Sequence, residues 1–357
     1  MSMTIGEYFK ISIFGESHGP AIGAVIDGVP AGTEISLENI MLHMRRRAPG
    51  RPGTTPRAET DIPEFLSGIF NGRATGAPIC LIIRNQNTRS GDYEQLKALM
   101  RPGHADYPAY IKYKGFNDYR GGGHFSGRLT APITAAGSIA RDIMQKRGIY
   151  ICARLASAGK AESLPFKSLE PEEFKKLWEK DFPCVGDAQE LKEEISRAAE
   201  NGDSLGGSIE CVITGLPAGL GEPFFDSVES CLAHILFSVP GVKGLFFGAG
   251  KEAPEMRGSQ FNDELELGEN GVRARSNNSG GANGGITNGM PVVFRVNMRP
   301  TPSISMEQHT VNVADMKEEI LRVRGRHDPC IAVRAVPVIE SAAAAALYDL
   351  LLRGGSL

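Results

Sequence analysis

Short β-branched runs that border Gly-Pro turns are the clearest hydrophobic pattern in the chain. Residues 23–32 (GAVIDGVPAG) and 209–219 (IECVITGLPAG) each lead into a Gly-x-Pro-Ala-Gly turn. Residues 75–85 (TGAPICLIIRN) and 287–297 (TNGMPVVFRVN) follow in the same order, and each places a Gly-x-Pro turn before a strand-like run. Runs of this kind bounded by Gly and Pro are typical of strands. Their repetition predicts an internal duplication of a strand-rich unit, and chance similarity between Gly-Pro turns is the alternative.

Segments with helical spacing lie between the predicted strands. Ser36 can cap the first of them, and Asp226 with Glu229 resembles a capping-box start for the fourth. The predicted helices are 36–47, 129–147, 187–201, 226–237 and 337–353. Because strands and helices alternate without regular βαβ spacing, the pattern predicts an α+β layered sandwich. We expect one domain over residues 1–357, with related halves at about 1–150 and 203–357 and a peripheral charged insertion at about 160–202.

Composition and charge exclude several classes of protein. The chain has 357 residues, with 39 basic and 42 acidic side chains, so it lacks the basic surplus of a general nucleic-acid binder. No apolar run reaches about 18 residues, and the N-terminal segment lacks the pattern of a signal peptide. The six cysteines are about 20 or more residues apart, which excludes CxxC metal or redox motifs. We therefore expect a cytoplasmic protein with reduced thiols, no membrane partner and no metal site.

Arginines are concentrated after the first predicted helix. No acidic residue lies between Glu38 and Glu59, and five arginines fall in this stretch, namely Arg45, Arg46, Arg47, Arg51 and Arg57. A guanidinium group can donate two parallel hydrogen bonds to the oxygens of one phosphate or carboxylate. A Pro/Gly/Thr-rich loop with several arginines therefore favours an anion site. A solvated basic end of a helix is the alternative.

Three loops place a histidine near arginine or acidic residues. His104 lies in RPGHAD (101–106), His18 lies in GESHG (15–19), and His327 lies in GRHDPC (325–330). Neighbouring charges set the protonation and the tautomer of a histidine, so these loops are candidates for proton transfer. Each loop alone is typical of a protein surface, but three in one chain favour a functional site.

Glycine makes up 43 of 357 residues, about 12% against a usual ~7%, and it is clustered. RGGGHFSGR (120–128) leads directly into a predicted helix, and backbone N–H groups at such a turn can bind phosphate. RPTPS (299–303) adds a cation and hydroxyls after the strand at 292–298. The residues alone therefore predict an anion-binding site and name no reaction. A flavin or nicotinamide oxidoreductase and a non-catalytic phosphometabolite- or RNA-binding module are both open alternatives.

These segments resemble the chorismate synthase family. The matching strings run in family order along nearly the whole chain: GESHG (15–19), DGVP (27–30), RRR (45–47), RPGHAD (101–106), YRGGG (119–123), RGSQ (257–260), GGANGG (280–285) and GRHDPC (325–330). The resemblance implies a lyase that performs a 1,4-anti elimination of phosphate from 5-enolpyruvylshikimate 3-phosphate to give chorismate. It implies reduced FMN as cofactor without net redox change, a β-α-α-β sandwich, and a homotetramer. Some members reduce flavin with NAD(P)H, but we expect this chain to depend on an external flavin reductant.

The resemblance also implies catalytic roles for individual residues. His18 corresponds to the acid that serves the phosphate, and His104 to the partner of reduced flavin N1. Asp328 corresponds to the carboxylate near flavin N5, and Ser17 and Ser126 would relay protons.

Binding residues follow from the same resemblance. The arginines expected on the substrate side are Arg46, Arg51, Arg101 and Arg128. The residues expected to contact FMN are His124, Phe125, Ser126, Pro240, Gly241, Gly284, Arg299, Pro300, Thr301, Pro302, Ser303 and Arg326. Together with the catalytic residues they come from distant parts of the chain, so the hypothesis requires that the fold bring them into one pocket.

Overall fold

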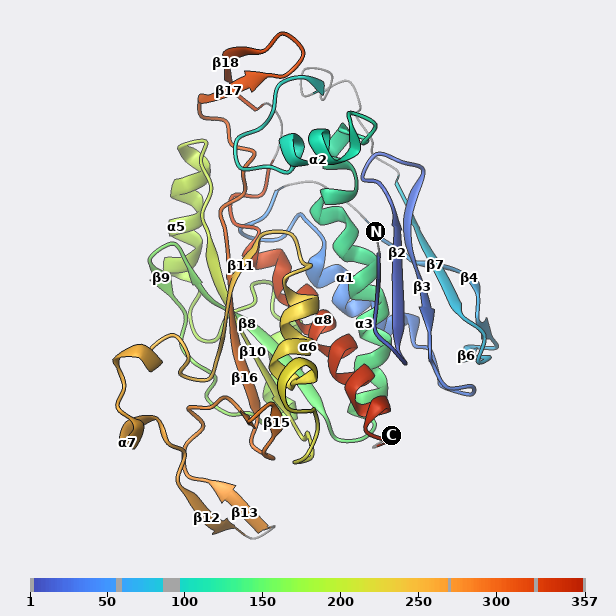
Figure 1. Cartoon of the computed structure of the whole chain (residues 1–357), viewed down its shortest axis with the longest axis vertical. Helices are drawn as coiled ribbons and strands as arrows, with labels where there is room; N and C mark the ends of the chain where they lie inside the picture. Colours follow the sequence, from blue (N-terminus) through green and yellow to red (C-terminus); the bar gives the residue numbers. More distant parts are fainter. Residues whose placement is uncertain (1–2, 56–59, 86–96, 269–270, 324–326, 356–357) are drawn as a thin grey trace.

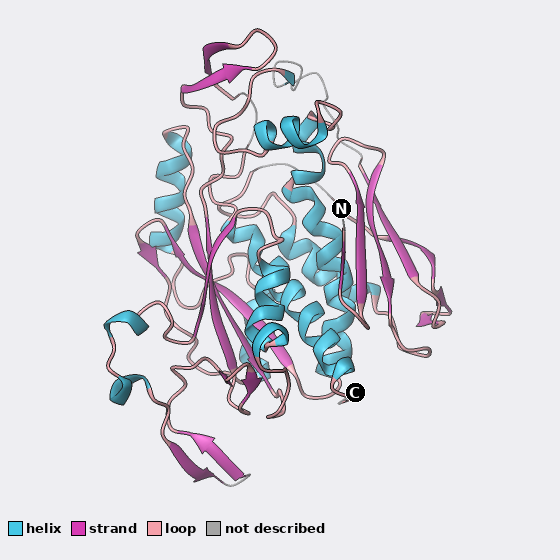
Figure 2. Ribbon diagram, in the orientation of Figure 1, coloured by secondary structure: helices cyan, strands magenta, loops and turns pink. Residues whose placement is uncertain are grey.

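Two five-stranded antiparallel sheets lie on either side of a layer of helices in the computed structural model (Figures 1 and 2). The structure describes residues 3–55, 60–85, 97–268, 271–323 and 327–355. The first sheet contains, in spatial order, β1 (Thr4–Ile5), β2 (Lys10–Gly15), β3 (Ala21–Asp27), β7 (Ile79–Arg84) and β4 (Glu64–Ser67). The second contains β11 (Val242–Phe247), β16 (Val292–Met298), β10 (Gly207–Thr214), β8 (Tyr150–Ala158) and β9 (Ala161–Glu162). The predicted α+β class is confirmed.

The helix layer is built around two long buried helices. α3 (Thr130–Gln145) packs on the first sheet, and α8 (Ala332–Arg353) packs on the second. α1 (Leu37–Arg47) packs against α3, and α6 (Val228–Leu236) packs against α8. Both long helices are rich in alanine and other small residues, which allows the helices and sheets to approach closely.

The remaining elements lie around this core. The other helices are α2 (Asp106–Tyr113), α4 (Pro171–Glu179), α5 (Gln189–Glu200) and α7 (Gly258–Phe261). The two-stranded hairpins are β5–β6 (Ile69–Phe70, Arg73–Ala74), β12–β13 (Leu265–Gly268, Gly271–Ala274), β14–β15 (Ala282–Asn283, Ile286–Thr287) and β17–β18 (Gln308–Asn312, Lys317–Leu321). In Figure 1, α2 and β17–β18 lie at the upper end of the molecule, whereas α7 and β12–β13 project from the lower end.

Helix starts agree with the sequence prediction only in part. The Ser36 hydroxyl accepts a hydrogen bond from the Asn39 backbone N–H, so the predicted cap of α1 is confirmed. The predicted start of α6 at Asp226 is wrong, because Ser227 is the cap and its hydroxyl accepts from the Ser230 N–H. The predicted start of the last helix at Pro337 is also wrong, because Pro337 lies inside α8.

The two sheets share one strand order and one register. β3 pairs with β7 so that Ile26 opposes Ile79, and β10 pairs with β16 so that Ile213 opposes Val292. In the two pairs of similar sequence segments, Ile26 corresponds to Ile213 and Ile79 corresponds to Val292. An edge strand also occupies the equivalent place in each sheet, because β4 lies next to β7 in the first and β11 lies next to β16 in the second. A common register supports the proposal that the two halves arose by duplication.

The charged segment between the halves covers part of the second sheet. Side chains of β8 and β10 alternate between two faces, and Cys152 and Val212 point away from the main core. They form a second apolar cluster with Phe174, Leu177 and Trp178 of α4. This segment therefore contributes to packing as well as to the charged surface.

The close crossing of α3 and α8 joins the two halves. A Cβ atom at Gly137 would lie 2.1 Å from the backbone oxygen of Ser341, a separation that real Cβ contacts do not reach. The neighbouring Glu340 is fully buried, and its carboxylate accepts hydrogen bonds from Arg46 of α1 and Arg141 of α3. Burial alone would raise the pKa of Glu340, but the two arginines lower it, so the carboxylate is charged.

α8 is long and apolar enough to cross a membrane by length and composition alone. Most of its residues are buried between the helix layer and the second sheet. Its apolar character is therefore accounted for by the core of this fold.

We predict that Gly137→Ala destabilises the protein by about 1–3 kcal/mol, because the added methyl group must displace the α8 backbone. Urea unfolding monitored by circular dichroism would measure the change. Gly258→Ala is the matched control, since nothing lies within 4 Å of a Cβ at that helical glycine. Equal stability of the two variants would contradict the close crossing.

Candidate functional site

A cavity of about 1090 Å³ opens where the two halves of the chain meet. Its walls include the first turns of α3 and α8, the turn after β2, and residues 101–105, 237–243 and 298–303. The side chains of Ile5, Ile11 and Ile13 form an apolar part of the wall. The cavity is large enough for two ligands of small-molecule size.

Most of the residues predicted for the site line this cavity. The structure brings together Ser17, His18, Arg101, His104, His124, Phe125, Ser126, Arg128, Pro240, Gly241, Arg299, Pro300, Thr301, Pro302, Ser303 and Asp328. They come from both halves of the chain, as the hypothesis of a single pocket requires. Arg326 lies outside the described residues.

Three predicted residues lie elsewhere. Arg46 is buried against Glu340 in the helix layer, and Arg51 donates to the backbone oxygen of Lys180 away from the cavity. Gly284 lies in the turn of the β14–β15 hairpin. None of the three lines the cavity, so their predicted roles remain predictions. The reason for Arg46 is helical geometry, because consecutive side chains of α1 point in different directions and it is Arg47 that faces the cavity.

A run of three glycines holds the two candidate histidines near each other. Gly121, Gly122 and Gly123 all have positive φ, a backbone conformation that other residues rarely adopt. A Cβ at Gly121 would lie 2.2 Å from Nδ1 of His18, and a Cβ at Gly122 would lie 3.1 Å from Cε1 of His104. The glycines are thus required for close approach of His18 and His104 to the same loop.

His104 is oriented by a carboxylate. Its Nδ1 lies 2.6 Å from Oδ1 of Asp106, and the Asp106 carboxylate also accepts from Nε and Nη2 of Arg101 at 2.7 and 2.8 Å. This contact assigns the proton to Nδ1, so Nε2 is the atom available for proton exchange. Burial lowers the pKa of His104, the hydrogen bond to Asp106 raises it, and Arg101 lowers it, with a net shift downward. His104 is therefore mainly neutral near pH 7.

Buried carboxylates also hold the arginines of the opposite wall. Asp61 accepts from Nη1 of Arg47 at 2.8 Å and from Nη1 of Arg128. Burial would raise the pKa of Asp61, but Arg47 and Arg128 lower it, so it is ionised. Asp328 accepts from Nη1 of Arg334 at 2.6 Å and from the backbone N–H of Thr55 at 2.9 Å.

Sequence reasoning missed several of these residues. Asp61 and Arg334 were outside the predicted site, although each holds or contributes a charged group at the cavity. Asp106 was not in the list of predicted site residues, but the RPGHAD motif predicted it as the acidic neighbour of His104, and the contact is present. Asp61 and Arg334 lie outside the sequence motifs that predicted the site, although Arg334 is only six residues from its partner Asp328 and Asp61 is 14 residues from Arg47.

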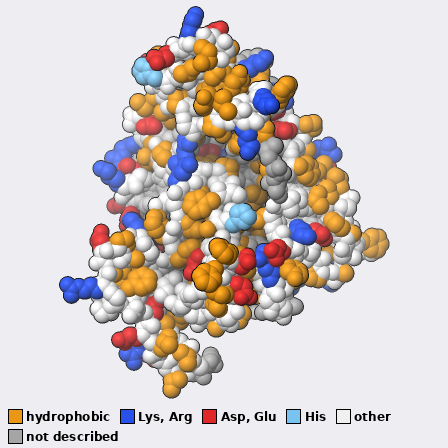
Figure 3. Space-filling model, viewed as in Figure 1, with side chains coloured by type: hydrophobic (Ala, Val, Ile, Leu, Met, Phe, Trp, Pro, Cys, Tyr) orange, Lys and Arg blue, Asp and Glu red, His pale blue; other side chains and the backbone are white. Residues whose placement is uncertain are grey.

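Positive charge is concentrated inside the cavity. Its lining cations are Arg47, Arg101, Arg128, Lys243, Arg299 and Arg334. On the face shown in Figure 3, by contrast, basic and acidic side chains are interspersed without a continuous basic patch. The amino-terminal turns of α3 and α8 also line the cavity, and helix amino termini favour anions. Fold and site together define an α+β protein with a cavity suited to an anionic ligand and to proton transfer by histidine.

Comparison with known proteins agrees with this class. The family model for chorismate synthase matches residues 9–352. A chorismate synthase of Dehalococcoides mccartyi strain BAV1 is 47% identical over 99% of this chain and 98% of the relative. That of Thermococcus kodakarensis is 44% identical over 98% of this chain and 97% of the relative. A crystal structure of chorismate synthase superposes with a TM-score of 0.77 and 31% identity, covering 98% of this chain and 93% of the other.

The chain belongs to the chorismate synthase family. It is thus an enzyme of the shikimate pathway with lyase activity, and the family named from the sequence motifs is confirmed. A phosphorylated small molecule is the class of substrate that the family acts on, which fits the cationic cavity.

We predict that Asp106→Asn lowers the pKa of His104 further, because the substitution removes the negative charge that favours the imidazolium. NMR titration of the histidine Cε1–H signals would measure the midpoint. Asp118→Asn is the matched control for His104, since Asp118 pairs with Arg120 and the histidine that it interacts with is His18. An unchanged or raised midpoint in Asp106→Asn would contradict the assigned contact.

Proposed function

We propose that the enzyme performs the 1,4-anti elimination of phosphate from 5-enolpyruvylshikimate 3-phosphate, giving chorismate, with reduced FMN and no net redox change. The observation that carries this proposal is the convergence of arginines from both halves with His18 and His104 on one cavity. Family membership supplies the reaction class, and the cavity supplies groups suited to its charges.

The leaving phosphate accounts for the arginines. Negative charge grows on the phosphate oxygens as the C–O bond breaks, and fixed cations stabilise that charge. We assign this task to Arg128 and Arg47, which Asp61 holds in place, with His18 as the acid that donates a proton to the phosphate. Loss of one such contact typically costs ~3 kcal/mol of transition-state stabilisation.

The residues present also fit a flavin mononucleotide. The hydroxyls of Thr55 and Thr301 are buried without a hydrogen-bond partner among the described residues, and both threonines line the cavity. Pro240, Gly241 and residues 299–303 would hold the cofactor, with the rings of His124 and Phe125, 4.3 Å apart, beside it. When bound in reduced form, FMN supplies an electron-rich ring that can lend an electron and accept a proton. The cavity volume accommodates both the cofactor and the substrate.

The protein's own part is to hold protons and orient groups. Because Asp106 holds the proton of neutral His104 on Nδ1, Nε2 of His104 would accept a proton beside the cofactor. Asp328 is oriented by Arg334 and by the Thr55 N–H, which suits a carboxylate that accepts a proton at a defined place. Ser17 and Ser126 line the same cavity and would relay protons.

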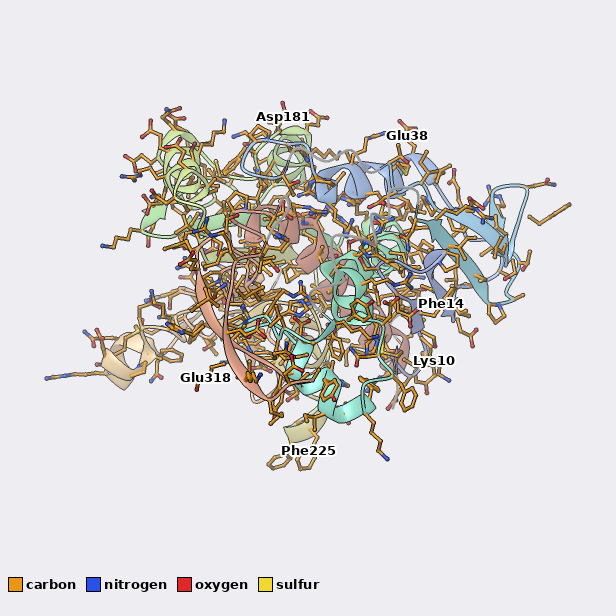
Figure 4. All side chains as sticks on the ribbon, turned by 90° about the horizontal axis from the view of Figure 1, so that it is seen from above. Lys10, Phe14, Glu38, Asp181, Phe225 and Glu318 are labelled. Atoms are coloured by element: carbon orange, nitrogen blue, oxygen red, sulfur yellow. The ribbon has the colours of Figure 1, made fainter. Side chains whose placement is uncertain are left out.

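The remaining expectations are proposals of the same kind. We place the enzyme in the cytoplasm, supplied with FMN by a separate reductase and without its own use of NADPH. We also propose a homotetramer. Phe224, Phe225 and Leu267 are more than four-fifths exposed, and Phe225 projects outward in Figure 4, so association would bury apolar surface that is costly to leave in water.

Phosphate release from 5-enolpyruvylshikimate 3-phosphate, with and without dithionite-reduced FMN, tests the reaction. We expect release only with reduced FMN, and reduced flavin recovered unchanged after many turnovers. Loss of one reduced flavin per turnover would instead identify an oxidoreductase. Absence of release under both conditions would contradict the proposal.

We predict that His18→Ala and His104→Ala each lower kcat by about 10- to 1000-fold, since each removes a positioned proton donor or acceptor. The phosphate-release assay at saturating reduced FMN would measure the loss. His309→Ala is the matched control, because His309 is an exposed residue of β17 outside the cavity. Wild-type turnover in either cavity variant would remove that histidine from the mechanism.

A further inference from the structure

Asn85 makes a set of contacts that the function described above does not use. It follows β7 directly, and its side chain lies between the cavity arginine Arg128 and the turn that carries His18. Its Oδ1 accepts a hydrogen bond from Nε of Arg128 at 3.1 Å. Its Nδ2 donates to the backbone oxygens of Glu16 at 3.1 Å and of Gly19 at 2.8 Å.

The orientation of this amide follows from its partners. If the oxygen and nitrogen were exchanged, Oδ1 would face two carbonyl oxygens and the amide nitrogen would face the Nε–H of Arg128. Both changes replace hydrogen bonds with repulsion. The side chain therefore uses both donors and its acceptor in one arrangement only.

These contacts connect two candidate catalytic elements. Glu16 and Gly19 are the two ends of the tight turn that contains His18, and the Gly19 N–H donates to the Glu16 oxygen at 3.1 Å. On the other side of Asn85, Arg128 is held at Nη1 by Asp61. The turn is also held at Ser17, whose N–H donates to the Gly123 oxygen at 3.1 Å.

We propose that Asn85 is a positioning residue, which sets the turn of His18 against the guanidinium of Arg128 so that the acid and the phosphate-binding cation keep one relative geometry. This inference rests on the proposed function of His18 and Arg128. Displacement of a catalytic group by about 1 Å can cost on the order of 100-fold in rate, so small rotations of this turn matter.

Asn85→Asp is the sharpest test, because it changes one NH₂ group to an oxygen. The acceptor for Arg128 is kept, whereas both donations to the turn are lost and an anion faces two carbonyl oxygens. Asn85→Ala removes all three contacts without adding charge. Asn262→Asp is the matched control, because Asn262 is an exposed residue after α7.

Two measurements separate this inference from the proposed function. Hydrogen exchange of the ligand-free enzyme reports on residues 15–20 directly and needs no substrate. We expect faster exchange there in both Asn85 variants, with exchange elsewhere unchanged. Steady-state phosphate release should show kcat reduced by about 10- to 100-fold while KM changes less than about threefold, and reduced FMN should still bind.

Each other outcome has a defined meaning. Wild-type exchange and kcat in Asn85→Ala would overturn the proposal, even if Asn85→Asp were impaired, since that loss would come from the added charge. Lowered melting temperature with equal loss of flavin binding would also overturn it, since Asn85 would then be needed for folding. If the wild-type enzyme releases no phosphate, the proposed function fails, while the exchange data still decide whether Asn85 holds the turn.

Discussion

The close crossing of α3 and α8 is the constraint on which the rest of the structure depends. The two helices belong to different halves of the chain and cover different sheets, so their separation sets the thickness of the helix layer. Only glycine at position 137 permits this approach. The adjacent Glu340 carries a buried charge that Arg46 and Arg141 must neutralise at the same crossing. The backbone contact and the charge pairing therefore occur at the same crossing, where an unpaired Glu340 would be costly.

The cavity follows from this crossing, because the first turns of both helices end at it. Several of its arginine side chains are already held in place without a bound ligand. Asp61 fixes Arg47 and Arg128, Asp106 fixes Arg101, and Asp328 fixes Arg334. An arginine side chain carries about 2 kcal/mol of rotamer entropy, so a guanidinium already held by a carboxylate loses less on binding an anion.

The sequence was sufficient to predict the main strands of both sheets and many residues of the site. The repeated strand segments predicted β3, β7, β10 and β16, and most of the site residues that the family resemblance implied line the cavity. Arg46 is a case in which the partner of a charged side chain is distant in the chain. Arg46 lies in an arginine run that favours an anion site, yet its partner is Glu340, nearly 300 residues away, and nothing local distinguishes it from Arg47. The cap of α6 was missed for a different reason, since Asp226 and Ser227 are both good caps and only the backbone geometry selects Ser227.

Because the two sheets have matching registers, similar turns in the two halves of the chain can be compared with each other. Ala48-Pro49-Gly50 follows α1 and Val239-Pro240-Gly241 lies shortly after α6, and the two glycines have φ values of 89° and 95°. Gly241 borders the cavity, whereas Gly50 bonds to Thr55 within its own loop. The two Pro-Gly turns thus share a glycine with positive φ, but only Gly241 borders the cavity. Comparing such turns between the halves distinguishes glycines required by the backbone from residues that border the ligand cavity.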